Sequence, residues 1–169
     1  MAVLEILQYP DPRLRIKAES VTQIDDDIRK KVEDMYETMY VNQGVGLAAT
    51  QVNIHLQIFT MDISDTRDKP LCVINPEILT KSGMQYDYHG CLSVGAGLGI
   101  SDKLERAAKL RLRGMDLDGK IFEWDLDELA AICVQHEVDH LNGILFIDHL
   151  SRLKLDRIRK KIDKAQRRV

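Results

Sequence analysis

The chain has 169 residues, 44% hydrophobic and 30% charged, with a net charge of −3. This size and composition predict one soluble globular domain spanning residues 1–169. No apolar run approaches the ~20 residues of a membrane span, and the start of the chain lacks the regions of a signal peptide, so we expect a cytoplasmic protein. The three cysteines (Cys72, Cys91 and Cys133) have no framework spacing, which argues against a disulfide scaffold.

The first predicted helix runs from about residue 25 to residue 42. Apolar side chains recur there at helical spacing, at Ile28, Val32, Met35 and Met39. Gly44 follows just past its end, as is common after a helix. Two short apolar stretches bounded by turn residues, 56–63 and 71–74, are typical of strands.

The second half of the chain predicts a hairpin followed by two helices. Residues 110–113 alternate between apolar and basic, and Asp118-Gly119 forms a turn signal before a further strand at 121–126. A helix is expected from about residue 127 to residue 141, and a last one over about 151–168. Strands between helices in this order predict an α+β fold.

The helix at 127–141 contains His136-Glu137-Val138-Asp139-His140, an HExxH motif. Positions i and i+4 of a helix lie on the same face, so the two imidazoles can hold one metal ion. Glu137 follows the first histidine and can act as general base toward a water molecule. The motif therefore indicates a metal-dependent hydrolase. Asp139 is either an outer partner that orients a ligand or a surface charge.

A third ligand is not provided by the usual downstream patterns. The position of a third histidine is Phe146, and no glutamate follows Glu137. Asp148 and His149 remain as donors, but they follow an apolar run that is typical of packing. Cys91 is the best upstream candidate, because a thiolate and two imidazoles leave a fourth position open, as catalytic sites require.

Three motifs together resemble one known family. The stretches His136-Glu137-Val138-Asp139-His140-Leu141-Asn142-Gly143, Gly90-Cys91-Leu92-Ser93 and Gly44-Val45-Gly46-Leu47-Ala48-Ala49-Thr50-Gln51 are similar to the signatures of peptide deformylase. The resemblance runs from Leu4 to about Leu155. The family removes the formyl group from the N-terminal formyl-methionine of new bacterial and organellar proteins.

The resemblance implies a fold of antiparallel sheets around a central HExxH helix, with a further helix at the C-terminus. It implies that Cys91, His136 and His140 bind the metal and that Glu137 is the general base. The side chain of Gln51 and the backbone N–H of Leu92 would stabilise the oxyanion. The N-formylmethionyl substrate would contact Gly44, Val45, Gly46, Gly90, Leu129, Ile132 and Cys133. We read Cys133 as a wall residue and Cys72 as part of the core.

The donor set by itself suits zinc, whereas the resemblance implies Fe²⁺ in the cell, with Zn²⁺, Ni²⁺ or Co²⁺ as substitutes.

The segment 151–169 carries nine Lys or Arg against two Asp. Such a run is usually a solvated helix face, but the resemblance implies a C-terminal helix that docks on the ribosome.

The sequence departs from the family pattern in two places. His89 stands where the family has glutamate, so Arg106 is expected to lack its usual acidic partner, and His89 to take a surface or outer-shell place. Residues 95–99 replace a proline and charged residues, including a basic one that helps to hold the substrate. Three alternatives stay open: a zinc endopeptidase, a non-catalytic member that binds formyl-peptides or ribosomes, and a paralogue with altered peptide preference.

Overall fold

The structure is a computed structural model that describes residues 2–168. Its helices are α1 (Asp26–Val41), α2 (Glu128–Leu141) and α3 (Arg152–Arg167), with short 3-10 helices at Pro12–Arg15, Ala49–Val52 and Phe146–His149. Its strands are β1 (Gly46–Ala48), β2 (Ile58–Met61), β3 (Leu71–Ser82), β4 (Gln85–His89), β5 (Asp102–Arg106), β6 (Lys109–Met115) and β7 (Ile121–Asp127). The predicted α+β class is confirmed.

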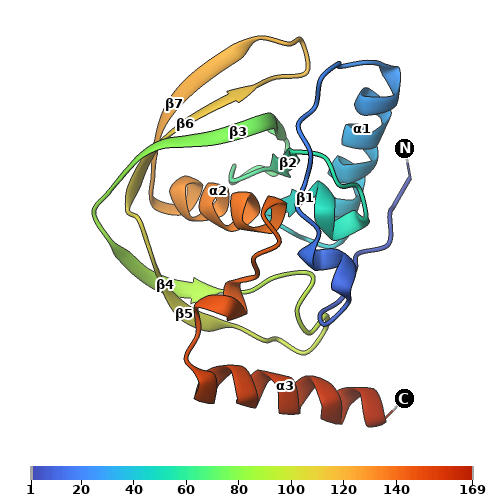
Figure 1. The fold of residues 1–169 in the computed structure, drawn as a ribbon, viewed down its shortest axis with the longest axis vertical. Helices are drawn as coiled ribbons and strands as arrows, with labels where there is room; N and C mark the ends of the chain where they lie inside the picture. Colours follow the sequence, from blue (N-terminus) through green and yellow to red (C-terminus); the bar gives the residue numbers. More distant parts are fainter. Residues whose placement is uncertain (1, 169) are drawn as a thin grey trace.

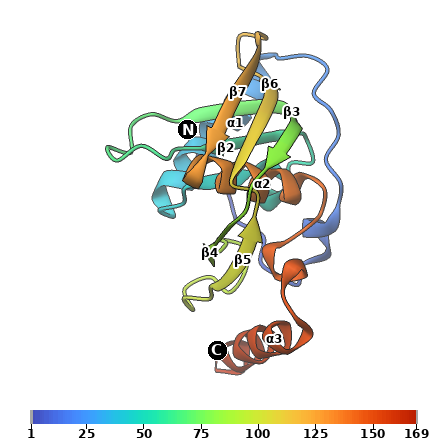
Figure 2. The same ribbon diagram turned by 90° about the vertical axis from the view of Figure 1, so that its left-hand side faces the viewer.

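All strand pairs are antiparallel, as the family resemblance implied. One sheet has five strands in the order β1-β2-β3-β6-β7, and the other consists of β4 and β5. Figures 1 and 2 show α2 between the two sheets, with α3 beyond β4 and β5 at the C-terminal end. The motif helix is therefore the central element of the fold.

The predicted hairpin is present as β6 and β7, with Gly119 at a φ of 78° in its turn. The stretch predicted at 71–74 is longer than expected, because β3 continues to Ser82. Asn75 adopts a φ of 51°, and the register against β6 shifts between Ile74 and Glu77. This irregularity lets the strand continue through Pro76, which cannot donate a ladder hydrogen bond.

The first helix begins as expected and ends slightly earlier. The Asp25 carboxylate accepts a hydrogen bond from the backbone N–H of Ile28 at 2.9 Å, which caps the N-terminus. The helix ends at Val41, and Gln43, with a φ of 56°, provides the left-handed residue that the chain needs to turn away. Gly44 therefore does not provide the left-handed residue that ends the helix. Its role is a packing one at the cavity described below.

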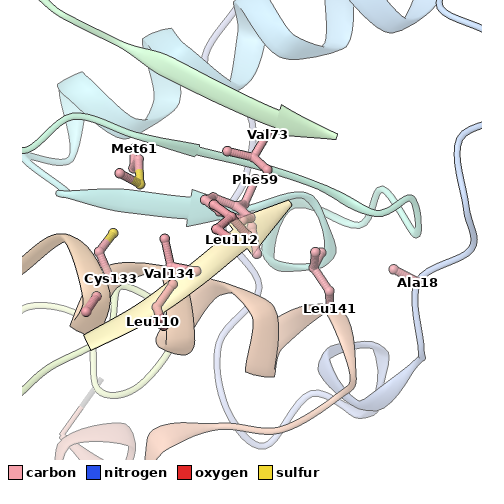
Figure 3. Packing of buried hydrophobic residues seen from close by; sticks show 11 residues of the cluster. Ala18, Phe59, Met61, Val73, Leu110, Leu112, Cys133, Val134 and Leu141 are labelled. Atoms are coloured by element: carbon pink, nitrogen blue, oxygen red, sulfur yellow. The ribbon is translucent and has the colours of Figure 1, made fainter. Parts of the chain in front are cut away.

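The main core fills the space between α2 and the five-stranded sheet. Figure 3 shows Leu110 and Leu112 of β6 and Phe59 of β2 beside Val134 of α2. Phe59, Leu112 and Val134 are fully buried, and each such side chain contributes about 1.5–3 kcal/mol of hydrophobic free energy. This packing fixes the position of α2, and with it the side chains of the HExxH motif.

A separate apolar cluster attaches α3. Ile158 and Ile162 are buried and pack with residues of the 3-10 helix after α2, of β5 and of the segment 94–100. The Ser151 hydroxyl accepts from the N–H of Lys154 at 3.3 Å and caps this helix, which was predicted over about 151–168. Two basic side chains of α3 add polar contacts to this cluster: Lys154 pairs with Asp102 of β5 at 3.1 Å, and Arg159 donates to the Tyr9 hydroxyl at 2.8 Å. Among the described residues, no helix has the length and apolarity to cross a membrane.

Candidate active site

The three predicted metal ligands lie together. His136 and His140, four residues apart on α2, have their Nε2 atoms 3.1 Å apart. Cys91 follows β4, and its Sγ lies 3.2 Å from Nε2 of His140. One donor atom from each residue can be chosen so that all three lie within 4.8 Å of one another. The fold therefore places one metal ligand, which follows β4, beside two metal ligands on the central helix α2.

This donor set fits a divalent metal ion. Metal–nitrogen bonds of about 2.0–2.1 Å and a metal–sulfur bond of about 2.3 Å place tetrahedral donor atoms roughly 3.3–3.6 Å apart. The two separations from Nε2 of His140, 3.1 and 3.2 Å, are only slightly shorter. The other candidates lie elsewhere, because Asp148 pairs with Arg15 at 2.5 Å and His149 contacts Asp139 at 3.0 Å.

Burial controls the protonation of all three donors. It lowers the pKa of His140 to about 3 and that of His136 well below its usual value, so both imidazoles are neutral at pH 7. Burial also raises the pKa of the Cys91 thiol to about 12. A metal cation favours the thiolate and would lower this pKa. The neutral imidazoles already have the form that a metal requires.

Glu137 lies beside the donors with only 3% of its surface exposed. Burial raises the pKa of its carboxyl to about 8, although the Arg106 guanidinium acts in the opposite direction. Its Oε1 has no hydrogen-bond partner among the described residues. A carboxyl with a pKa near neutrality can both accept and return a proton. Gly46 makes room for it, since a Cβ there would lie 2.6 Å from Oε2 of Glu137.

Gln51 is buried with its amide group oriented by three neighbours. Its Oε1 accepts from the N–H of Ala48 at 2.9 Å, and its Nε2 donates to Oγ of Ser93 at 3.0 Å. The same Nε2 lies 3.6 Å from Sγ of Cys91. The N–H groups of the Gln51 amide therefore face the three metal-binding side chains. From there they can donate to an oxygen atom bound beside the metal.

A cavity of about 570 Å³ opens onto these groups. Twelve of the thirteen residues that the sequence predicted for the site line this cavity, and only His140 does not. The lining residues are Gly44, Val45, Gly46, Gln51, Gly90, Cys91, Leu92, Leu129, Ile132, Cys133, His136 and Glu137. Gly44 has a packing role, because a Cβ there would lie 2.8 Å from the Leu92 side chain. The cavity lining within the described chain contains no Lys or Arg.

Other lining residues were missed. Ile6, Gln8, Asn42, Gln43, Tyr88, Val94 and Ile100 reach the cavity from four separate segments and carry no motif that could have identified them. His89 also lines the cavity. It is buried, and its ring lies 6.5 Å from that of His136 in a stacked orientation. His89 was expected either at the surface or in the outer shell of the metal site. Because the side chain is buried, the surface prediction is wrong.

Arg106 finds its acidic partner on α2. Its Nη1 donates to Oδ2 of Asp139 at 2.7 Å, and His149 contacts the same oxygen at 3.0 Å. Position 89 carries no carboxylate that could pair with Arg106, but Asp139 supplies one from the helix. Asp139 lies inside the HExxH motif, so this ion pair connects β5 to the helix that carries both histidines.

Comparisons with known proteins identify the family of this chain. Residues 3–156 match the model of a family described as polypeptide deformylase. A peptide deformylase from Stutzerimonas stutzeri is 51% identical over 99% of this chain and 98% of the relative. Peptide deformylase 1 of Pseudomonas syringae pv. tomato has the same identity and coverage.

Solved structures give the same result. A peptide deformylase from Legionella pneumophila superposes with a TM-score of 0.92 at 41% identity, covering 98% of this chain and 96% of the other. The peptide deformylase of Ehrlichia chaffeensis in complex with actinonin gives a TM-score of 0.92 at 38% identity, with 99% of both chains covered. The chain therefore belongs to the polypeptide deformylase family.

Proposed function

We propose that this enzyme removes the N-formyl group from the N-terminal formyl-methionine of newly made proteins and releases formate. The observation that carries the proposal is the cluster of Cys91, His136 and His140 beside the buried carboxyl of Glu137, at the wall of a cavity large enough for a peptide end. The family to which the chain belongs supports it. The reaction is proposed to take place in the cytoplasm, where new chains leave the ribosome.

Cys91, His136 and His140 would hold one divalent ion, Fe²⁺ in the cell, with Zn²⁺, Ni²⁺ or Co²⁺ as substitutes. Such an ion acidifies water and polarises a carbonyl oxygen. Glu137 would accept the proton of the attacking water and return it to the leaving amine, a double role that its pKa of about 8 in the metal-free protein supports.

The remaining roles concern the substrate. The Gln51 amide and the Leu92 N–H would donate to the oxyanion of the tetrahedral intermediate, where one donor is worth about 3–4 kcal/mol. The peptide backbone would lie along Gly44, Val45, Gly46 and Gly90 as an added strand. Leu129, Ile132 and Cys133 would surround the methionine side chain.

Formate release from formyl-Met-Ala-Ser tests the proposal, with protein loaded anaerobically with ferrous iron. Glu137→Ala should lower kcat by at least about a hundredfold at unchanged iron content, because the proton acceptor is lost. Glu128→Gln, an exposed change on the same helix, is the matched control. Absence of formate release by fully loaded wild-type protein would overturn the proposal.

Of the three alternatives, the zinc endopeptidase and the non-catalytic member have no observation in their favour. A zinc endopeptidase has no need of Cys91, which lies within the donor cluster. A non-catalytic member has no need of a buried general base, and Glu137 is retained.

We further propose that α3 docks on ribosomal RNA. Its apolar contact uses Ile158 and Ile162, which leaves Lys160, Lys161 and Lys164 exposed on a helix with eight basic and two acidic residues. Attraction to phosphates would supply the binding energy and make it sensitive to salt.

Ribosome co-sedimentation tests this docking with the full chain, since deleting α3 would remove two core residues. Reversing Lys160, Lys161 and Lys164 to Glu should abolish co-sedimentation at low salt. Reversal of the exposed Lys81, Lys109 and Lys120 is the matched control with the same change in net charge. Equal loss in both triple variants would refute a specific role for α3.

A further inference from the structure

The outer face of β4 displays large side chains to solvent. Tyr86 and Tyr88 are 57% and 64% exposed, and Met84, just before the strand, is 66% exposed. These alternate residues share one face, and we refer to Met84, Tyr86 and Tyr88 as the aromatic strip. Lys103 of β5, opposite Tyr88, places its ammonium 5.2 Å from the centroid of the Tyr88 ring and 5.6 Å from that of Tyr86.

The fold does not need this face for packing. The opposite face of the same two strands carries His89, Leu104 and Arg106, which are all buried against the rest of the molecule. A row of exposed apolar side chains without a packing role marks a contact surface.

The aromatic strip is continuous with the catalytic cavity. Tyr88 belongs to the cavity lining. Tyr86 and Lys103 line a second hollow of about 460 Å³, whose other side is formed by Leu150, Ser151 and Lys154 at the start of α3. The strip therefore leads from the mouth of the cavity towards α3, along the side of the molecule where Figures 1 and 2 show β4, β5 and α3.

We propose that the aromatic strip binds the part of a formylated chain that follows its first three residues. The proposal rests on the proposed function, because a formyl group placed at Glu137 obliges the rest of the polypeptide to leave through the cavity mouth. A chain that runs back along β4 at about 3.3 Å per residue would place its residues four to seven over Tyr88, Tyr86 and Met84.

The chemistry of the strip favours a polypeptide over a nucleic acid. Glu105, opposite Tyr86, shares the outer face with the tyrosines, and its carboxylate would repel phosphates, while the Lys103 ammonium lies over the two rings. Asp87 accepts the N–H of Tyr88 at 2.7 Å, which occupies a backbone donor of β4. Recognition therefore falls to the tyrosine rings, which favour aromatic and large apolar side chains in the bound segment.

The experiment compares three substrates: formyl-Met-Ala-Ser, the same peptide extended by four glycines, and one extended by Gly-Phe-Gly-Leu. With wild-type, iron-loaded enzyme, we expect kcat/KM for the Phe-Leu extension to exceed that for the glycine extension by about three- to tenfold, mainly through KM. Tyr86→Ala should reduce this ratio to near one and leave turnover of formyl-Met-Ala-Ser unchanged. Tyr86→Phe should retain the ratio, because the ring is kept.

Ile121→Ala, a change at another exposed apolar side chain on β7, is the matched control and should retain the ratio. A wild-type ratio of one, or a ratio that Tyr86→Ala leaves intact, would overturn the role of the strip while formyl-Met-Ala-Ser is still turned over. Failure of the proposed function is distinguishable, because the wild-type enzyme would then release no formate from any of the three peptides.

Discussion

At the scale of single residues, the neutral side chain of His89 affects the charge balance beside the site. Burial and the nearby Arg106 guanidinium lower the pKa of His89 to about 4, so the ring is neutral at pH 7. Arg106 keeps one ion pair with Asp139, but its buried Nε and Nη2 have no partner in the described part of the chain. A buried guanidinium with unused donors costs stability.

A carboxylate placed at this position should therefore stabilise the protein. We predict that His89→Glu raises the free energy of unfolding at pH 7 by about 1 kcal/mol, because the new carboxylate can accept from the free edge of the Arg106 guanidinium. Urea denaturation of the metal-free proteins measures it. His89→Gln, which adds no charge, is the control and should give no increase. A lower stability of His89→Glu than of His89→Gln would contradict the prediction.

At the scale of elements, the loop after β2 holds the edge of the cavity. The Arg67 guanidinium donates to the carbonyl oxygens of Gly44 and Asp62, each at 2.5 Å, and lies over the ring of Tyr40. Asp62 is fully buried and accepts from Ser64 and from the Tyr40 hydroxyl at 2.6 Å. This network fixes Gly44, which lines the cavity.

The network should make stability depend on pH. Burial by itself raises the pKa of Asp62, but hydrogen bonds from Ser64, Tyr40 and Lys69 outweigh it and hold the pKa below its usual value of 3.8. A lowered folded-state pKa stabilises the protein above the unfolded value and loses that stabilisation as pH falls through the folded value. We predict that Asp62→Asn lowers the melting temperature by about 5 °C at pH 7. The difference should shrink below about pH 4, and a difference independent of pH would contradict the argument.

The attachment of α3 gives a second prediction for an element. Ile158 is 7% exposed within the cluster that joins α3 to the rest of the molecule, whereas Leu153 on the same helix is 63% exposed. Ile158→Ala should lower the free energy of unfolding by about 2–4 kcal/mol, and Leu153→Ala by less than about 0.5 kcal/mol. Equal effects of the two changes in chemical denaturation would show that the cluster does not hold α3.

At the scale of the whole molecule, the sequence predicted the central helix and its two histidines from a local pattern, whereas Cys91 was predicted by elimination and by the resemblance to a family. The spacing of His136 and His140 follows from helix geometry alone. The strands β4 and β5 were missed because they do not show the alternation of apolar and polar residues that predicts a strand. Leu104 is the one aliphatic side chain that points inward, and tyrosines and polar or charged residues fill the other positions. Their place is set by long-range pairing and by burial of Arg106 against α2, which no local pattern records.

Metal binding should stabilise the whole molecule, since its proposed ligands come from two layers of the fold. Cys91 follows β4, whereas His136 and His140 belong to α2, so one ion would join the small sheet to the central helix. An ion present at a hundredfold excess over its Kd adds about 2.7 kcal/mol, which corresponds to a rise of roughly 5–10 °C in Tm. Cys91→Ala should abolish the rise, and Cys133→Ala, in the same cavity but outside the donor cluster, should retain it.

The pH dependence of this rise tests the role of the thiol. Burial raises the pKa of Cys91 to about 12 in the metal-free protein, so binding at pH 7 must displace a proton from sulfur. Zinc affinity, measured by titration against a competing chelator, should therefore increase by at least about tenfold for each pH unit between pH 7 and pH 8, because the cation also favours ionisation of the Glu137 carboxyl, whose pKa is about 8. The neutral imidazoles contribute no further protons in that range, because their pKa values lie far below it. An affinity independent of pH would mean that Cys91 does not bind the metal as a thiolate, and Cys91→Ala would then retain the rise in Tm.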